Sequence, residues 1–133
     1  MATFRLELIS PQEVLLDEDV LSAVLPGVEG DMTILPGHGR LVSVLNPGMI
    51  EAVDAGGEVL RAFVSRAVAE IFEDAVTILA EMAVMEEDLG LEHIDVEIQR
   101  LKSAMEEAPD ETSSINASAQ IWRLEQIRLS RLN

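Results

Sequence analysis

The first part of the chain alternates between apolar and polar residues in short runs. Residues 3–9 place Phe4, Leu6 and Leu8 on one side, the period of two that indicates a half-buried β-strand. Further short apolar runs follow, separated by turn-forming residues, and together they predict roughly nine or ten strands. The acidic run at residues 17–19 lies between two of these runs, so we expect a solvated turn there. Many short strands at this spacing are typical of a β-sandwich or a flattened barrel.

Residues 24–48 interrupt this pattern with three Pro-Gly pairs, at positions 26, 36 and 47. Proline fixes φ for the second residue of a tight turn, and glycine accepts the positive φ that follows in a type II turn. The pairs therefore predict short strands that meet at three sharp corners. A compact cluster of polar side chains is expected at these corners: Glu29, Asp31, His38 and Arg40. Because the stretch carries no catalytic group, we interpret it as a docking edge.

The apolar period changes to three and four residues from Glu86 onward. Five apolar residues then fall on one stripe of an α-helix: Leu91, Ile94, Ile98, Leu101 and Met105. Pro109 is expected to end this helix, because proline lacks the backbone N–H that a helix interior needs. Residues 109–114 contain helix-capping residues and predict a short linker.

A second helix is expected from about residue 115 to residue 131. Its apolar residues cover a wide arc, so it is less clearly one-faced than the first helix. Three basic residues outnumber its one acid: Arg123, Arg128 and Arg131. A short linker between two helices predicts an antiparallel hairpin. The chain should therefore divide into a β-domain at residues 1–84 and a helical-hairpin domain at residues 85–133.

The composition of the chain narrows the classes of function. There are 25 acidic against 9 basic residues, and the formal net charge is −16 at pH 7. A nucleic-acid partner requires the opposite sign to neutralise phosphates, and an anionic membrane surface would repel this charge. Aromatic residues make up 3% of the chain and cysteine is absent, so we expect an aliphatic core and no disulfide or thiolate chemistry. These features favour a globular protein whose partners have basic surfaces.

Catalytic and metal-binding patterns are missing from the sequence. His38 and His93 are the only histidines, and neither has other ligands at metal-binding spacing, so we expect turn or surface roles for both. The acidic runs at residues 17–19 and 86–88 are expected to be solvated or to face a helix dipole rather than to form acid–base pairs. No serine lies in a G-x-S-x-G setting, and no glycine-rich stretch has the phosphate-loop pattern. We therefore expect no catalytic, cofactor or metal site.

The order of these parts resembles one protein family. A short-stranded β-domain carries Pro-Gly-Val-Glu-Gly at residues 26–30 and Ile-Leu-Pro-Gly-His at residues 34–38, and a helical hairpin follows. This order is similar to that of the epsilon subunits of bacterial F-type ATP synthases. Residues 63–65 and 76–80 resemble later strands of the same family. The resemblance implies a ten-stranded flattened β-sandwich followed by a C-terminal antiparallel two-helix hairpin.

The same resemblance implies a function. It indicates a non-catalytic subunit of the central stalk, or rotor, of a proton-translocating F-type ATP synthase at the cytoplasmic face of the bacterial inner membrane. Such a subunit binds the gamma subunit and the c-ring and couples the ring to the catalytic head. In the family, two residues face the ring: the acid that follows the Pro-Gly-x-Glu-Gly motif and the histidine that ends the second motif. They correspond here to Asp31 and His38. Arg40 stands where the family often has proline, so we expect it to alter this contact.

Some members of this family bind ATP through the motif D-x-x-R-A at the start of the first helix. When the motif is aligned on Asp88 and Leu89, its arginine becomes His93 and its alanine becomes Ile94. A second arginine of the family becomes Gln99. Because the groups that hold the nucleotide are mostly missing, we expect this chain to bind ATP weakly or not at all.

The C-terminal helices of the family can extend and block rotation of the stalk. In that arrangement Arg123, Arg128 and Arg131 would engage acidic loops of the alpha and beta subunits in the catalytic head. The alternative is that these arginines only solubilise a hairpin that stays folded, since charges on a helix surface usually contribute little. The sequence leaves both interpretations open.

Two other classes of function compete with the rotor subunit. The first is a free-standing β-sandwich module that binds a ligand or a protein and carries a helical tail. Such a ligand module needs surface aromatics, which this chain almost lacks. The second is a carboxylate-based hydrolase, which the dispersed acidic residues do not support. The rotor subunit is therefore the favoured interpretation.

Overall fold

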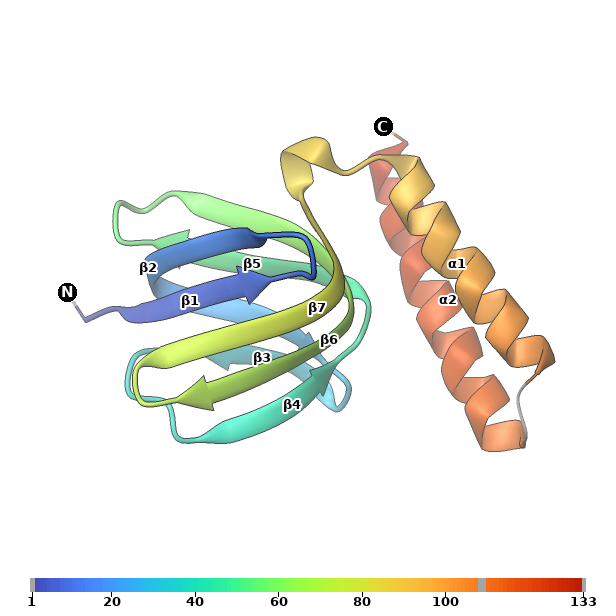
Figure 1. The fold of residues 1–133 in the computed structure, drawn as a ribbon, viewed down its shortest axis with the longest axis horizontal. Coiled ribbons are helices and arrows are strands. Elements are labelled where there is room, and N and C mark those ends of the chain that lie inside the picture. Colours follow the sequence, from blue (N-terminus) through green and yellow to red (C-terminus); the bar gives the residue numbers. More distant parts are fainter. Residues whose placement is uncertain (1, 108–109, 133) are drawn as a thin grey trace. The chain divides into compact units, whose positions relative to one another are not determined.

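The computed structural model describes residues 2–107 and 110–132 (Figure 1). The chain divides into two compact units, Met1–Asp88 and Leu89–Asn133. The first unit is built from strands and the second from two helices, in the order that the change of apolar period predicts.

Seven strands form the first unit in the part of the chain that the structure describes. They are β1 (Phe4–Ile9), β2 (Val14–Gly27), β3 (Gly30–Ile34), β4 (Leu41–Leu45), β5 (Gly48–Asp54), β6 (Val59–Phe72) and β7 (Ala75–Met85), followed by the 3₁₀ turn η1 (Glu86–Asp88). The expected count of nine or ten strands, ten in the family, is wrong for this chain. The count is lower because short runs that the sequence separates are joined here into the long strands β2 and β6. The sandwich architecture itself is confirmed.

The acidic run at residues 17–19 shows why the strands are longer than expected. It lies inside β2 and pairs with β1, so that Asp17 is opposite Glu7 and Asp19 is opposite Arg5. The Arg5 guanidinium donates to Asp17, with Nε 2.7 Å from Oδ1, and this hydrogen bond lowers the pKa of the Asp17 carboxyl. The expectation of a turn here is wrong because a cross-strand cation offsets the charge of the exposed acids.

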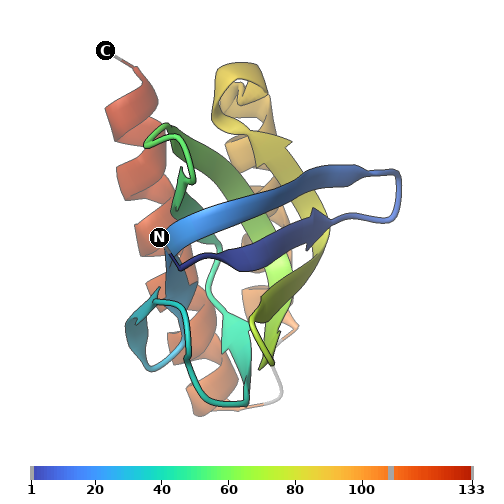
Figure 2. The same cartoon turned by 90° about the vertical axis from the view of Figure 1, so that its left-hand side faces the viewer.

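The long strands connect the two layers of the sandwich. The first half of β2 pairs with β1, and its second half pairs with β3 and β5. Likewise β6 pairs with β5 in its first half, with β4 in its second half, and with β7 along most of its length. The neighbours β1 and β7 are parallel and the other pairs are antiparallel. The β1–β2 hairpin faces the viewer in Figure 2.

The space between the layers is filled by aliphatic side chains, as the scarcity of aromatic residues predicts. Inward-facing residues of every strand contribute to this core, among them Leu6, Leu8, Val20, Leu25, Ile34, Leu45, Ile50 and Ile78. A core of this kind fixes the register of each strand, because a slip of one residue would turn the apolar side chains to solvent. The outer faces of the sheets are therefore held in defined positions for docking.

The second unit is an antiparallel hairpin of α1 (Leu91–Glu106) and α2 (Glu111–Arg131). Ile94, Ile98 and Leu101 of α1 are buried, as the predicted stripe requires, and so are three residues of α2: Ala117, Ile121 and Leu124. The expected end of the first helix at Pro109 lies outside the described residues. None of the helices described is long and apolar enough to cross a membrane.

Both helices begin at residues other than those expected. The first begins at Leu91 rather than near Glu86, because Gly90 donates its N–H to Nδ1 of His93 at 3.0 Å and closes the first turn. The second begins at Glu111 rather than Ile115, because Asp110 Oδ1 accepts the backbone N–H of Ser113 at 2.7 Å. Residues 111–114, interpreted as part of a linker, therefore form the first turn of α2.

Candidate docking surfaces

Only one of the three Pro-Gly pairs forms the predicted type II turn. The N–H of His38 donates to the carbonyl of Leu35 at 3.2 Å, and Gly37 between them has φ +83°, as this turn requires. The other two predictions are wrong. Gly27 ends β2, Gly48 begins β5, and neither has a positive φ. The corner near the first pair lies after Gly27, in the two-residue connection that joins it to Gly30. The residue with positive φ there is Gly30, at +128°.

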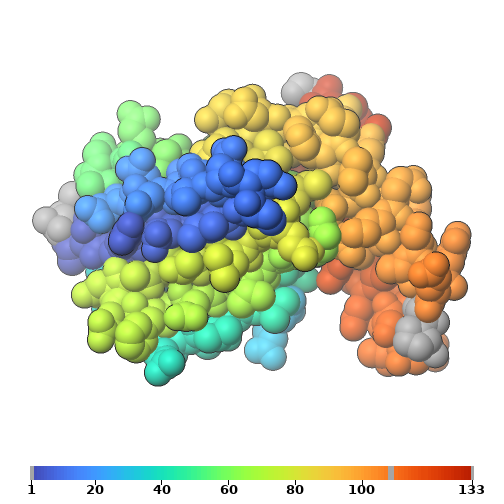
Figure 3. Space-filling view, in the orientation of Figure 1, coloured from blue at the N-terminus to red at the C-terminus, as the bar shows by residue number. Residues whose placement is uncertain are grey.

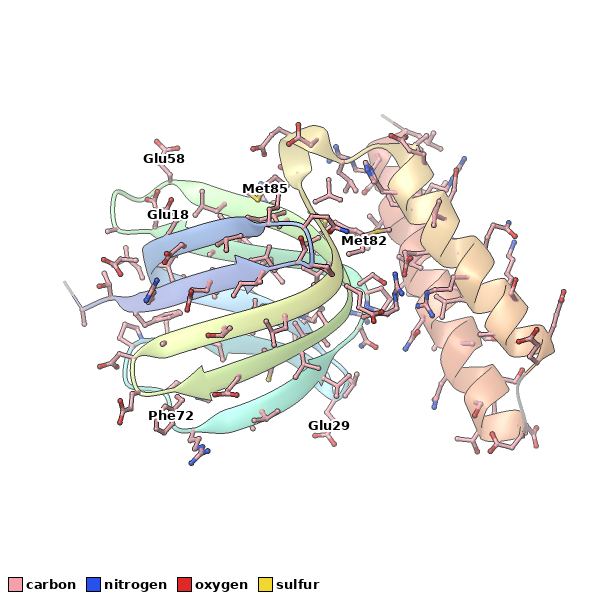
Figure 4. All side chains as sticks on the ribbon, viewed as in Figure 1. Glu18, Glu29, Glu58, Phe72, Met82 and Met85 are labelled. Atoms are coloured by element: carbon pink, nitrogen blue, oxygen red, sulfur yellow. The ribbon has the colours of Figure 1, made fainter. Side chains whose placement is uncertain are left out.

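The polar residues of this stretch do not form one compact cluster. Asp31 lies near the start of β3 and is opposite Pro26 of β2. His38 lies in the loop at the other end of β3, which spans only Gly30–Ile34. Figure 4 shows Glu29, next to the Asp31 end, far from Phe72, which marks the loop end. Asp31 and His38 are both exposed, but they are separated by the length of β3.

Arg40 joins the loop to the end of β6. Its guanidinium carbon lies 4.9 Å from the centroid of the Phe72 ring, which is within the range of a cation–π contact. A contact of this kind at an exposed site contributes about 0.5–1 kcal/mol. Together with the turn from Leu35 to His38, it holds both ends of the loop. Nothing in the sequence connects position 40 with position 72, so this contact was not predicted.

A row of apolar side chains crosses the outer face of the sheet formed by β4, β6, β7 and β1. The strand registers place Val44 beside Val68, Val68 beside Leu79, and Leu79 beside Ile9. Val44, Val68 and Leu79 are 56%, 40% and 56% exposed. This face is turned to the viewer in Figures 1 and 3. We call these four residues the apolar row.

A shallow pocket of about 300 Å³ continues the apolar row beyond β7 and β1. It is lined by Ile9, Ser10, Pro11, Arg66, Leu79, Ala80 and Glu81. The Arg66 and Glu81 side chains form an ion pair across it, with N–O 2.7 Å. An apolar surface with a charged rim is characteristic of a protein–protein interface. The sequence contained one signal for this surface, because some strands carry apolar residues on both faces. A strand with one solvated face would carry polar residues on that face.

A second groove, of about 400 Å³, lies between β3 and β4. It is lined by residues 27–32 and 41–44, and therefore includes Asp31. Its walls are mainly strand edges and exposed valines rather than groups that perform chemistry. The described residues contain no group of three or more His, Cys, Asp or Glu side chains that would hold a metal ion.

The three arginines of α2 do not act as one group. Nε of Arg128 lies 2.7 Å from Oδ1 of Asp95 in α1, and a terminal nitrogen of Arg131 donates to the carbonyl of Leu89 at 3.2 Å. Arg128 and Arg131 therefore bind within the helical unit. Arg123 is half-buried, and its buried Nε has no hydrogen-bond partner among the residues described.

A groove of about 510 Å³ runs between the two helices. Its charged lining residues are two acids and two bases: Asp95, Glu125, Lys102 and Arg128. The remaining lining residues are Ile98, Gln99 and Leu129. Because Arg128 is already paired with Asp95, the groove offers little net positive charge to a polyphosphate. Weak or absent binding of ATP stays a prediction.

Comparisons with known proteins match the fold and almost the whole chain. The family model for the ATP synthase delta/epsilon chain, beta-sandwich domain, matches residues 3–86. The ATP synthase epsilon chain of Rhodospirillum rubrum is 34% identical over 116 residues, which cover 87% of each chain. The ATP synthase epsilon chain of Parvibaculum lavamentivorans is 34% identical over 122 residues, which cover 92% of each chain.

Two solved structures share this architecture. A chain of the Euglena gracilis mitochondrial ATP synthase, in a structure of OSCP, F1 and the c-ring, matches with a TM-score of 0.72 and 25% identity. The match covers 98% of this chain and 82% of that one. A chain of the central stalk and c-ring structure of Tetrahymena thermophila mitochondrial ATP synthase matches with a TM-score of 0.61. At 11% identity over 93% and 95% of the two chains, this second likeness concerns the fold alone.

Proposed function

The chain belongs to the ATP synthase delta/epsilon family, and we propose that it is a non-catalytic central-stalk subunit, a rotor subunit of an F-type ATP synthase that joins gamma to the c-ring. The family expected from the two Pro-Gly motifs is thereby confirmed. The proposal goes further in naming the neighbouring subunits, the absence of catalysis, and the cytoplasmic face of the bacterial inner membrane as the location. The observation that supports it best is the apolar row, together with the loop at residues 35–40, which is held by the Leu35–His38 turn and the Arg40–Phe72 contact.

We assign the apolar row to the contact with gamma. Val44, Val68 and Leu79 are more than one third exposed on strands that are paired in a sheet. The solvated face of a sheet in a protein without a partner normally carries polar residues. Burial of such a surface contributes about 25 cal/mol per Å² of apolar area. A rotor must transmit torque, and a flat apolar face on a rigid sheet resists displacement better than a flexible loop does.

We assign the contact with the c-ring to Asp31, His38 and Arg40. Asp31 and His38 lie at opposite ends of β3, so they would touch the ring at two separate points. Two separated contacts resist rotation about either one. Arg40 would act mainly on the orientation of the His38 loop, because its guanidinium already stacks on Phe72.

A regulatory role of the helical unit is a further part of the proposal. To engage acidic loops of the alpha and beta subunits, Arg128 must leave Asp95 and Arg131 must leave the Leu89 carbonyl. Both contacts are at least partly accessible to solvent, so each contributes little to stability. Transfer of Arg128 and Arg131 to an acidic partner therefore costs little, whereas Arg123 makes neither of these contacts.

Purification of the tagged chain from membranes of its host tests the assignment. Co-elution with ATPase subunits is expected, and Val68→Glu should reduce it at least tenfold because it places a charge in the apolar row. Val59→Glu is the matched control, since Val59 is an exposed valine of the same strand outside the row. Elution of the wild-type chain alone as a monomer would favour a free-standing binding module instead.

A further inference from the structure

Two strand edges lie open beside the groove between β3 and β4. β4 pairs with β6 along its whole length, but it meets β2 only where Leu45 is opposite Gly27. β3 pairs with β2 alone. An unpaired edge presents a row of backbone N–H and C=O groups that can pair with another strand.

The two open edges come together at one end of the groove. There the N–H of Val28 donates to the carbonyl of Val44 at 3.2 Å, and the N–H of Asn46 donates to the carbonyl of Pro26 at 2.7 Å. The Asn46 side chain also donates to the carbonyl of Gly27 at 3.2 Å. Beyond this junction the strands are unpaired with each other, and the groove of about 400 Å³ opens between them.

The hydrogen bond from Val28 fixes which backbone groups of β4 face the groove. The Val44 carbonyl points away from β6, and in an antiparallel pair such residues alternate with those that bond to the neighbouring strand. The N–H and C=O of Val42, two residues earlier, therefore point to the same open edge. The N–H groups of Leu41 and Ser43 are directed to β6.

The sequence of β4 lacks the features that protect a permanently open edge. Natural edge strands carry lysine, proline or a bulge, which prevent pairing with other chains. β4 reads Leu-Val-Ser-Val-Leu, with no charge and no proline, and Val42 is 62% exposed. β3 differs, because its Asp31 is an exposed charge at the edge. The open edge of β4 is therefore suited to be covered in the assembly.

We propose that an extended segment of a neighbouring stalk subunit adds to the open edge of β4 as a further β-strand. This proposal rests on the proposed function, because it takes its occupant from the assembly. A partner of about five residues matches the length of β4, since a strand rises about 3.3 Å per residue. Its side chains are apolar beside Val42 and Val44 and basic beside Glu29, which lines the opposite side of the groove.

Residue-resolved amide hydrogen exchange on the free subunit and on the purified complex tests this pairing. The Val42 amide is expected to exchange at least tenfold more slowly in the complex. The Leu41 and Ser43 amides serve as internal controls, because they bond to β6 in both states and should change much less. Protection of Val42 that grows with concentration in the free subunit would identify a second copy as the occupant and overturn the proposal.

A pair of substitutions tests the same point through assembly. Val42→Pro removes the outward N–H without removing a donor to β6, and it should weaken retention in the complex at least tenfold. Val42→Ala keeps the N–H and should weaken it much less. Circular dichroism of each free variant checks that the sandwich still folds. If the proline variant does not fold, the exchange experiment decides between the outcomes.

A complex that forms normally, with a Val42 amide that exchanges as fast as in the free subunit, refutes strand addition and leaves the rotor assignment intact. Failure of the chain to co-purify with ATPase subunits refutes both.

Discussion

Nε of Arg128 lies 2.7 Å from Oδ1 of Asp95, and this ion pair joins the last turn of α2 to the start of α1. The two side chains are 37% and 47% exposed, so the pair contributes at most about 1 kcal/mol. Asp95→Asn should therefore speed amide exchange at the end of α2 by less than about fivefold, and the effect should vanish in 1 M salt. Glu92→Gln removes an acid from the same helix without touching Arg128. An equal effect of both substitutions would show that the pair is not a specific latch.

The same ion pair bears on nucleotide binding. With Arg128 held by Asp95, and with Glu125 on the opposite wall, the groove between the helices should not attract a triphosphate. Titration of the wild-type chain with Mg-ATP, followed by Trp122 fluorescence and by calorimetry, is expected to show no saturation at micromolar concentrations. The Asp95→Asn variant, which releases Arg128, is the control that should bind more tightly. Saturable micromolar binding by the wild-type chain would contradict the prediction.

The sequence predicted the elements whose signal is local. The turn from Leu35 to His38 follows from a Pro-Gly pair, and the buried stripe of α1 follows from its spacing. It could not predict features that depend on a distant partner. The acidic run at residues 17–19 continues a strand because Arg5, far away in the sequence, lies across from it. For the same reason nothing local pointed to the stacking of Arg40 on Phe72.

Helix α1 gives a second example of this limit. Glu97 is 1% exposed and accepts a hydrogen bond from Nε of Arg100 at 3.2 Å. Its position between Ile94 and Leu101 was the available signal, because spacing of three and four residues places it on the buried stripe. The residue type argued against burial, and only the structure shows that a partner satisfies the carboxylate.

The turn between β6 and β7 contains a strained residue that can be relieved. Glu73 has φ +45°, a left-handed conformation that costs a non-glycine residue about 1–2 kcal/mol. Glu73→Gly removes this cost but adds unfolded-state entropy, so the free energy of unfolding should rise by about 0.5–1 kcal/mol in urea denaturation. Asp74→Gly in the same turn should lower it, because Asp74 does not have a positive φ. A loss of stability in the Glu73 variant would show that the conformation is not strained.

The start of α2 should depend on pH through Asp110. The backbone N–H of Ser113 donates to this carboxylate and lowers its pKa below the usual value of about 3.9. A lowered pKa in the folded state means that the stabilisation is fully present above the unfolded value and is lost as pH falls through the folded value. Asp110→Ala should therefore melt at lower temperature than the wild type at pH 7, with a smaller difference at pH 2–3. Asp110→Asn keeps a cap that does not titrate, and its melting temperature should lack this component of the pH dependence. Identical pH profiles for the aspartate and asparagine forms would exclude the capping role.

Truncation separates the roles of the two units. A chain of residues 1–88 should fold alone and still assemble, because its core and the apolar row are complete without the helices. It should be about 1 kcal/mol more stable than a chain of residues 1–84, because Met85 packs on the core and is opposite Ala62 of β6.

If the helices regulate the enzyme, complexes that carry the 1–88 chain will hydrolyse ATP faster than those with the full chain. A deletion of residues 109–133 alone is the comparison that keeps α1, and it too should assemble. Equal hydrolysis rates for all three complexes would leave the helical unit without an inhibitory role, whereas loss of assembly by the 1–88 chain would place part of the docking surface on the helices.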